Sequence, residues 1–378
     1  MLKWKNIEVI ILAKLILSGY FGFDNIGDEA ILLSMIGAFR SIEPEVDLLA
    51  LSGNPARTRE KYQLSAIKRT NIAALIKELR DCDLFVSGGG SLLQDVTGLK
   101  SIPFYLGQVL LAQLMGTRTA FYAQGIGPVK NRFYRRLIKW VMGRADYISV
   151  RDPMSRKLLL EWGIEEEKVK LTVDPVFVLK GLFQEDKERD NKKERPLIGV
   201  SVRPWGDNTY LDSLSLALGK FAREIEADIL ILPFHAGEDL EPGRELQEKL
   251  LADFQQNDYN GEVLLETYTA TLEMLEKYRE IDIFLGVRLH SLIFAALAQI
   301  PFVGLEYDPK VEGFLQMMGI NSGVKMEKLD AGELYRVISS VYTHSSDFRT
   351  VLQHRTDLFA RAAVISAEEL LKGVIRND

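Results

Sequence analysis

The stretch GVRLHSLIFAALA, residues 286–298, follows an apolar run, residues 281–286, that predicts a buried strand. An apolar helical pattern begins immediately after it, so only a few residues join the strand to the helix. A strand that leads directly into a helix is the repeating unit of an α/β fold with a parallel sheet. Arg288 and His290 stand at this junction. A capped turn would explain them, and so would an anion bound at the start of the helix.

The same alternation of strand and helix runs through the rest of the chain and divides it into two halves. Short apolar runs separated by helical patterns predict parallel sheets. The predicted strands are residues 14–20, 46–52, 82–88, 118–124, 147–151 and 169–174 in the first half, and 196–203, 227–234, 262–267, 282–289 and 300–307 in the second. The charged stretch between the halves, residues 181–196, predicts a linker.

We therefore expect an α/β protein with two Rossmann-like domains facing a cleft. Residues 1–180 should form the first domain, residues 197–345 the second, and residues 346–378 a helical tail. Ligands of such sheets bind at the carboxyl ends of the strands.

The composition limits the classes of function. The 378 residues carry a formal net charge of −6, which argues against general affinity for nucleic acid. A single cysteine, Cys82, leaves no disulfide framework and favours a reducing compartment. No group of histidine, cysteine and acidic residues has the spacing of metal ligands, so we predict neither a metal nor a cofactor. The apolar stretch near the N-terminus is short and interrupted by Lys14, so membrane contact should be peripheral. The role of residues 1–13 stays open.

Three strand ends of the first half combine glycines with polar side chains. Glycine allows tight turns and a close approach of the backbone to a ligand. Asp28 opens a helix and occupies its positive end, so a sugar hydroxyl suits this position better than a phosphate. Structural turns alone are the alternative. The residues that we expect to form a binding surface are Tyr20, Asn25, Gly89, Gly90, Ser91, Gln94 and Gln124.

Cations and imidazoles mark the strand ends of the second half. Because the carboxyl ends of parallel strands share one edge of a sheet, these side chains can converge. Such a set suits a small dianion or trianion. The residues are Arg203, His235, Arg288, His290 and Lys310, with Leu289 between two of them and Arg151 contributed by the first half.

Residues 129–144, VKNRFYRRLIKWVMGR, predict an amphipathic helix without an acidic residue. Its basic face should consist of Arg132, Arg135, Arg136 and Lys139, and its apolar face of Phe133, Tyr134, Leu137, Ile138 and Val141. The basic face is either a solvated helix surface or a contact with anionic lipid head groups or a diphosphate.

Seven motifs, in this order, resemble the polysaccharide pyruvyltransferase family. They are GYFGFDNIGDEA, SGGGSLLQD, YAQGIGP, SVRDPMS, GVSVRPW, GVRLHSLIFAALAQIP and YDPKVEGF, and they span roughly residues 14–320. The strongest likeness is to bacterial enzymes that pyruvylate N-acetylmannosamine in secondary cell-wall polymers, which anchor S-layer proteins.

The resemblance implies a GT-B-like architecture, phosphoenolpyruvate as donor and a 4,6-linked pyruvate ketal as product. It implies a lipid-diphosphate-linked glycan as acceptor, and hence a cytoplasmic protein that touches the inner face of the cell membrane. With that donor, His290 is the expected general acid and Arg288 a cation that holds the donor's anionic groups. Asp28 or Asp95 is the expected general base.

Two other functions fit the same residues. A nucleotide-sugar glycosyltransferase could use this architecture, with Glu306 as the carboxylate late in the second domain. A glycan-binding protein without catalysis would need no acid at His290.

Overall fold

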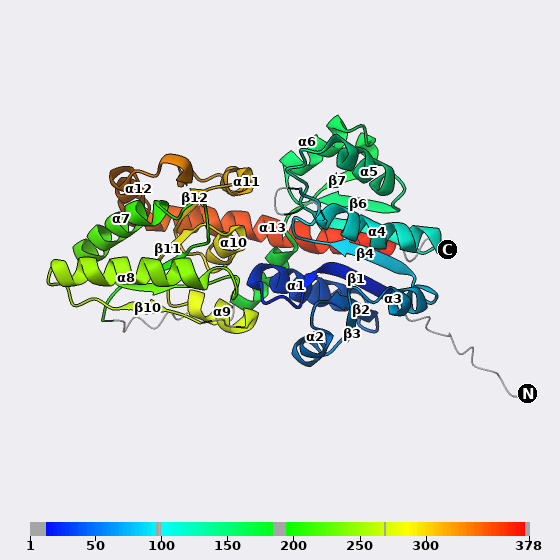
Figure 1. Ribbon diagram of the computed structural model, residues 1–378, viewed down its shortest axis with the longest axis horizontal. Coiled ribbons are helices and arrows are strands. Elements are labelled where there is room, and N and C mark those ends of the chain that lie inside the picture. Colours follow the sequence, from blue (N-terminus) through cyan, green and yellow to red (C-terminus); the bar gives the residue numbers. More distant parts are fainter. Residues whose placement is uncertain (1–12, 96–97, 99, 184–193, 268–269, 375–378) are drawn as a thin grey trace, which may run out of the picture.

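The structure is a computed structural model that describes residues 13–95, 98, 100–183, 194–267 and 270–374. It contains two parallel sheets, each covered by helices on both faces and placed side by side along the long axis of the molecule (Figure 1). The prediction of two Rossmann-like α/β units is confirmed.

The first sheet has the strand order β3-β2-β1-β4-β5-β6-β7, and all neighbours are parallel. Its strands are β1 (Lys14–Phe21), β2 (Asp47–Ser52), β3 (Ser65–Lys68), β4 (Leu84–Gly88), β5 (Arg118–Gln124), β6 (Tyr147–Val150) and β7 (Val169–Leu171). The central strands are buried almost throughout, as expected when helices cover both faces. The sequence did not predict β3, because this short edge strand has exposed polar residues at both ends.

The second sheet has the order β10-β9-β8-β11-β12-β13 and is also parallel. Its strands are β8 (Leu197–Ser201), β9 (Asp228–Ile231), β10 (Val263–Leu265), β11 (Ile283–Gly286), β12 (Phe302–Glu306) and β13 (Gly323–Lys325). The short edge strand β13 was not predicted. The predicted strand 282–289 was too long, because Arg288 is already the N-cap of the next helix.

Helices α1 to α6 belong to the first half and α7 to α12 to the second. Their bounds are α1 (Ile26–Ile42), α2 (Pro55–Tyr62), α3 (Ile72–Leu79), α4 (Ser101–Leu114), α5 (Arg132–Met142), α6 (Pro153–Glu161), α7 (Tyr210–Ile225), α8 (Leu240–Gln256), α9 (Thr271–Tyr278), α10 (Leu289–Leu297), α11 (Pro309–Met318) and α12 (Ala331–Thr343). Short 3-10 helices are η1 (Glu166–Lys168), η2 (Pro175–Phe183) and η3 (Met326–Lys328).

One apolar core connects the two halves. The inner faces of both sheets, together with α1, α10 and η2, contribute to a single cluster of buried residues. Two further clusters lie on the outer faces, one under α7, α8 and α12 and the other under α3 to α6. The halves are therefore packed against each other and not merely joined by a linker.

The last helix, α13 (Ser345–Val374), runs along both halves (Figure 1). It contacts α10 and α11 of the second half, and further on α1, β5 and β6 of the first. Tyr147 of β6, for example, donates its hydroxyl to the carbonyl of Ser366 at 3.3 Å. The predicted linker, residues 181–196, lies largely outside the described residues, as do residues 1–12 and the last four of the predicted tail.

The two halves also meet backbone to backbone beside the cleft. The amide of Ile26 donates to the carbonyl of Phe234 at 2.9 Å, and the amide of Ala236 donates to the carbonyl of Asp24 at 3.3 Å. This two-bond bridge fixes the start of α1 against the loop after β9.

Candidate active site

A cavity of about 590 Å³ lies between the carboxyl ends of the central strands of both sheets. The strand order reverses between β1 and β4 in the first sheet and between β8 and β11 in the second. The crevice beyond such a reversal is the usual ligand site of an open α/β sheet. The expected residues that line the cavity are Tyr20, Asn25, Asp28, Gly90, Ser91, Gln94, Arg151, Arg203, His235, Arg288, Leu289, His290 and Lys310.

The loop after β1 is held by a buried carboxylate. Glu29, which is 4% exposed, accepts hydrogen bonds from the amide of Gly22 (2.7 Å) and the hydroxyl of Tyr62 (2.5 Å). Asn25 caps α1 by accepting from the amide of Gly27 at 3.1 Å. These bonds fix the first turn of α1 and leave Asp28 on the cavity wall.

Asp28 lies where its ionised form is disfavoured. Burial raises the pKa of its carboxyl to about 6, although the charges of His290 and Arg151 act in the opposite direction. A carboxylate with such a pKa can exchange a proton near neutral pH.

The glycine turn after β4 adopts a left-handed backbone. Gly89 and Gly90 have φ of 61° and 66°, a region that a side chain strongly disfavours. Gln124 donates to the carbonyl of Gly90 at 3.0 Å and is fully buried. Gly89 and Gln124 therefore support the turn from behind, whereas Gly90 and Ser91 reach the cavity.

Asp174 joins a cation and an imidazole from opposite halves. Its Oδ2 lies 2.5 Å from Arg151 Nη1 and 3.6 Å from His290 Nε2. Burial raises the pKa of Asp174, but the charges of Arg151 and His290 outweigh it and hold that pKa well below its usual range. Arg151 Nη2 also donates to Ser91 Oγ at 3.0 Å, so the guanidinium is fixed from two sides. The sequence did not predict Asp174.

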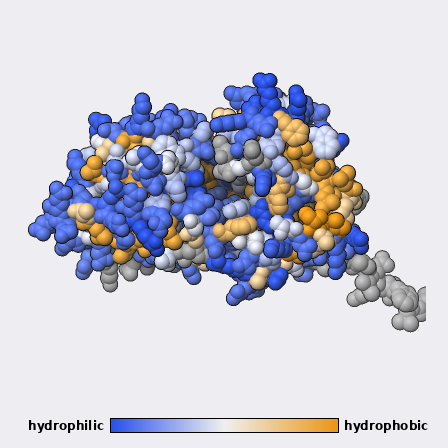
Figure 2. Space-filling model, viewed as in Figure 1, coloured by the Kyte–Doolittle hydropathy of each residue, from blue (hydrophilic) through white to orange (hydrophobic). Residues whose placement is uncertain are grey.

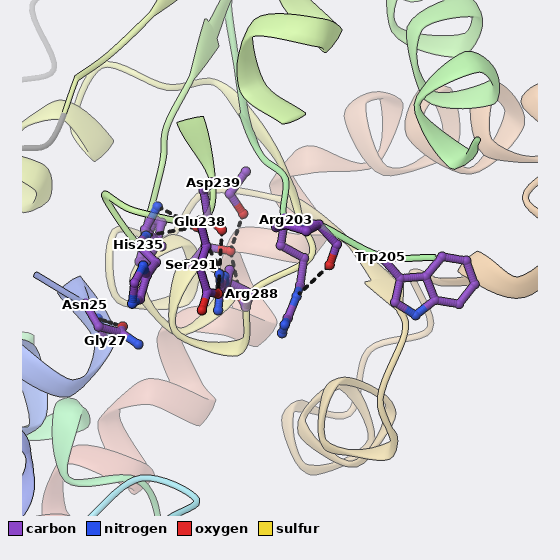
Figure 3. A network of polar contacts seen from close by, with 12 residues as sticks. Asn25, Gly27, Arg203, Trp205, His235, Glu238, Asp239, Arg288 and Ser291 are labelled. Carbon is purple, nitrogen blue, oxygen red and sulfur yellow. Dashed lines mark hydrogen bonds and ion pairs between the residues drawn. The ribbon is translucent and has the colours of Figure 1, made fainter. Parts of the chain in front are cut away.

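Arg288 is already paired with two carboxylates (Figure 3). Its Nη2 lies 2.5 Å from Asp239 Oδ1 and 2.9 Å from Glu238 Oε2. Asp239 is fully buried and accepts from the amides of Phe234 and His235, so it fixes the loop that carries His235. The sequence predicted Arg288 as a cation that holds an anion, and it did not predict these two carboxylate partners. Glu238 is half-exposed and is the partner that a ligand could displace.

Arg203 and Lys310 lie on the second-domain side of the cavity. Arg203 donates to the hydroxyl of Tyr307 at 2.9 Å, and its guanidinium lies 4.7 Å from the centre of that ring. Burial lowers the pKa of the Lys310 ammonium, although Asp308 acts in the opposite direction. Tyr307 was not predicted, although it directly precedes the DPK motif.

Arg69 is a further cation on the cavity wall that the sequence did not reveal. Four aromatic rings surround its guanidinium at 4.2 to 5.8 Å: those of Tyr20, Phe23, Phe104 and Tyr105. Its Nη1 is buried and has no hydrogen-bond partner. The aromatic pairs in GYFGF and PFYLG were the available signal, but only the fold brings them together around one arginine.

The predicted basic helix is α5, and it lies away from the cavity. Arg132, Arg136 and Lys139 are exposed, whereas Arg135 is half-buried and donates to the carbonyl of Val129. Phe133 was assigned to the apolar face of this helix, and 66% of it is exposed. Trp140 of the same helix and Leu114 of α4 are exposed apolar side chains too, and Figure 2 shows an apolar surface in the region of α4 and α5. The exposed face of α5 is therefore both basic and apolar.

Asp95, the alternative base, faces away from the cavity wall. Its carboxylate accepts from the amides of Lys130 and Asn131 and so holds the start of α5. Glu306, the carboxylate considered for a glycosyltransferase, is not among the described residues that line the cavity either. Within the described ranges, we find neither a helix long and apolar enough to cross a membrane nor three potential metal ligands in one cluster.

The two sheets and the cavity between them define a GT-B-like fold. A putative UDP-N-acetylglucosamine 2-epimerase from Listeria monocytogenes aligns over 97% of this chain and 98% of its own, with a TM-score of 0.67 and 12% identity. A glycosyltransferase from Rickettsia africae aligns over 97% and 100% (TM-score 0.66, 12% identity). Anabaena Alr3699/HepE, in complex with UDP and glucose, aligns over 95% and 98% (TM-score 0.59, 11% identity). At such identities the likeness establishes the fold alone.

The sequence determines the family. A model of the polysaccharide pyruvyl transferase family matches residues 25–309, most of the chain. The protein therefore belongs to the polysaccharide pyruvyl transferase family of enzymes. The matched range includes all the expected cavity residues except Tyr20 and Lys310, which lie just outside it. No curated protein matches the chain.

Proposed function

We propose that this enzyme transfers the pyruvyl group of phosphoenolpyruvate to N-acetylmannosamine in a lipid-diphosphate-linked cell-wall precursor, forming a 4,6-ketal and releasing phosphate. The charge of the cavity is the observation that supports phosphoenolpyruvate as the donor. Six side chains of arginine and lysine line the cavity, against the two carboxylates of Asp28 and Glu238. Phosphoenolpyruvate bears a phosphate and a carboxylate on three carbons, so it needs several fixed cations.

The donor lies between the two halves in this proposal. Arg203, Lys310 and Arg288 approach it from the second half and Arg151 from the first, while Leu289 and His235 complete the wall. Arg288 meets the donor's carboxylate or phosphate in place of Glu238, while Asp239 keeps the guanidinium oriented.

His290 supplies the proton that starts the reaction. Protonation of donor C3 makes C2 electrophilic, and an acceptor hydroxyl adds to C2 while Asp28 takes its proton. The second hydroxyl then attacks C2 as the C2–O bond to phosphate breaks, and the ring of the ketal closes. The departing phosphate takes the proton of this hydroxyl, and Asp28 returns its proton to solvent before the next turnover. Removal of a general acid costs about 10²–10⁴-fold in rate.

The acceptor sugar occupies the wall formed by the first half. Tyr20, Asn25, Ser91 and Gln94 line that wall, and Gln124 with Gly89 holds the turn beneath it. The sugar and its linkage rest on the narrower resemblance to enzymes of S-layer-anchoring polymers.

A lipid-linked acceptor requires contact with the inner face of the cell membrane, and α5 is the proposed surface. Its exposed cations attract anionic head groups, and the exposed rings of Phe133 and Trp140 suit the interface. The protein would then be a cytoplasmic, peripherally bound enzyme.

Phosphate release tests the reaction. The enzyme is incubated with phosphoenolpyruvate and a synthetic mannosamine-bearing disaccharide diphosphate lipid, and phosphate and ketal are measured. We expect one phosphate for each ketal, and none without the acceptor. Turnover of a sugar nucleotide without use of phosphoenolpyruvate would favour the glycosyltransferase instead.

The variant His290→Ala tests catalysis itself. We expect acceptor binding to persist and phosphate release to fall at least about 10²-fold. Undiminished function in this variant would favour a binding protein and would remove His290 as the acid.

A further inference from the structure

Asp174 is the only described residue whose carboxylate touches functional side chains from both halves at the cavity wall. It follows β7, is 5% exposed, and contacts Arg151 and His290. A buried carboxylate is costly unless it is paired. Its placement therefore points to a task beyond packing.

The ring of His290 is held with its two nitrogens in different surroundings. Nε2 is buried and lies 3.6 Å from Asp174 Oδ2, too long for a hydrogen bond. The opposite edge lies over Gly27 in the first turn of α1, where any Cβ would overlap Nδ1. Nε2 therefore faces the buried carboxylate, and Nδ1 faces the first turn of α1, which also carries Asp28.

A small movement would turn the 3.6 Å contact into a hydrogen bond. Catalytic hydrogen bonds are often long in empty sites and shorten when the substrate binds. Asp174 is ionised at neutral pH, because the charge of Arg151 favours that form. An ionised carboxylate can only accept a hydrogen bond, so Nε2 must carry the hydrogen.

We propose that Asp174 is the positioning residue of His290, and that Nδ1 is the nitrogen that passes the proton to the substrate. The assignment of the substrate rests on the proposed function. The imidazolium gives its Nδ1 proton to C3 of the enolpyruvyl group and becomes a neutral ring with hydrogen on Nε2. Nδ1 then regains a proton from solvent before the next turnover, while Asp174 stays ionised.

Other charges also act on this ring. Asp28 approaches it from α1 and Arg151 from the end of β6, while Arg288 is the N-cap of α10, the helix that carries His290. Arg151 weakens the effect of Asp174 without cancelling it, because Oδ2 contacts both groups. Replacing Asp174 by asparagine removes one negative charge and nearly keeps the shape.

The first measurement uses the wild-type protein without substrate. Its histidines are labelled with ¹⁵N, and His290 is assigned by comparison with His290→Gln. Above pH 8 we expect the neutral ring to carry its hydrogen on Nε2. A ring with hydrogen mainly on Nδ1 would overturn the proposal, whatever the enzyme turns over.

The second measurement compares Asp174→Asn with Asp146→Asn. Asp146 accepts one backbone hydrogen bond, from Thr119 in the same sheet, and lies outside the cavity. In Asp174→Asn we expect kcat to fall about 10- to 100-fold, within the range for losing an acid. The alkaline limb of its pH–rate profile should move to lower pH, because the ring loses a neighbouring anion. The control should resemble the wild type in both.

The outcomes separate the two hypotheses. A rise of KM for phosphoenolpyruvate with unchanged kcat and pH profile would mean that Asp174 serves Arg151 alone, and the proposal would fail. If Asp174→Asn does not fold, the labelled wild type still decides. If the wild type shows the Nε2–H ring but no turnover of phosphoenolpyruvate, the proposed function fails and the orientation by Asp174 stands.

Discussion

Removing the carboxyl of Asp28 should make the protein more stable at neutral and alkaline pH and make the enzyme less active. The pKa of this carboxyl rises from 3.8 to about 6 on folding because burial disfavours the charge. A rise of about two pKa units corresponds to about 3 kcal/mol at most. The side chain is only partly buried, so we expect a smaller cost of about 1–2 kcal/mol.

The pH dependence follows from the direction of this shift. Below about pH 4, Asp28 is protonated in both the folded and the unfolded chain, so ionisation costs nothing. As the pH rises through about 6, the folded protein must hold an unfavourable charge and loses this stability. The variant Asp28→Asn has no such charge, so its free energy of unfolding should exceed that of the wild type by about 1–2 kcal/mol at pH 8.

Urea unfolding at pH 4 and pH 8 measures the difference. Asp81→Asn, at an exposed carboxylate far from the cavity, is the matched control and should show no such change. The activity of Asp28→Asn should fall about 10²–10⁴-fold if Asp28 is the base. If the difference in free energy of unfolding between Asp28→Asn and the wild type is the same at pH 4 and pH 8, the reasoning about burial is refuted. Full activity would refute the assignment as base.

Three other perturbations test the site. Gly27→Ala should lower kcat at least about tenfold, because the added Cβ would overlap the ring of His290. The control Gly37→Ala, in the same helix, meets no atom and should keep full activity. Equal effects of the two substitutions on kcat would refute the contact. Glu238→Gln should lower KM for phosphoenolpyruvate severalfold by freeing Arg288, and an unchanged KM would show that Glu238 does not compete with the donor. Reversing the exposed cations of α5 should weaken sedimentation with anionic vesicles but not neutral ones, and unchanged sedimentation would make α5 an ordinary helix surface. The reversed residues are Arg132, Arg136 and Lys139.

The sequence predicted the strand ends well because local patterns determine them. An apolar run followed by a polar, glycine-bearing turn is readable from a few adjacent residues, so Arg203, Arg288 and Ser91 were placed correctly at the cleft edge. Edge strands such as β3 and β13 carry too few apolar residues for such a pattern.

The acidic partners of the cations could not be predicted in the same way. Asp174 and Asp239 look like ordinary polar residues in the sequence, and only the fold places them on Arg151 and Arg288. The exposure of Phe133 was missed for a related reason. A helical pattern gives the sides of a helix, but which neighbours cover each side depends on tertiary packing.

The course of α13 has a consequence for engineering. A chimera of a two-domain protein is simplest to make with a single fusion point between an N-terminal and a C-terminal half. Here the chain leaves the first sheet after η2, builds the second sheet, and returns along α13 to pack against β5 and β6. In sequence, the second sheet is therefore an insertion between η2 and α13, both of which pack against the first half. Exchanging it to alter donor preference would need two joints, one near residue 196 and one before α13, and a recipient that keeps its own last helix.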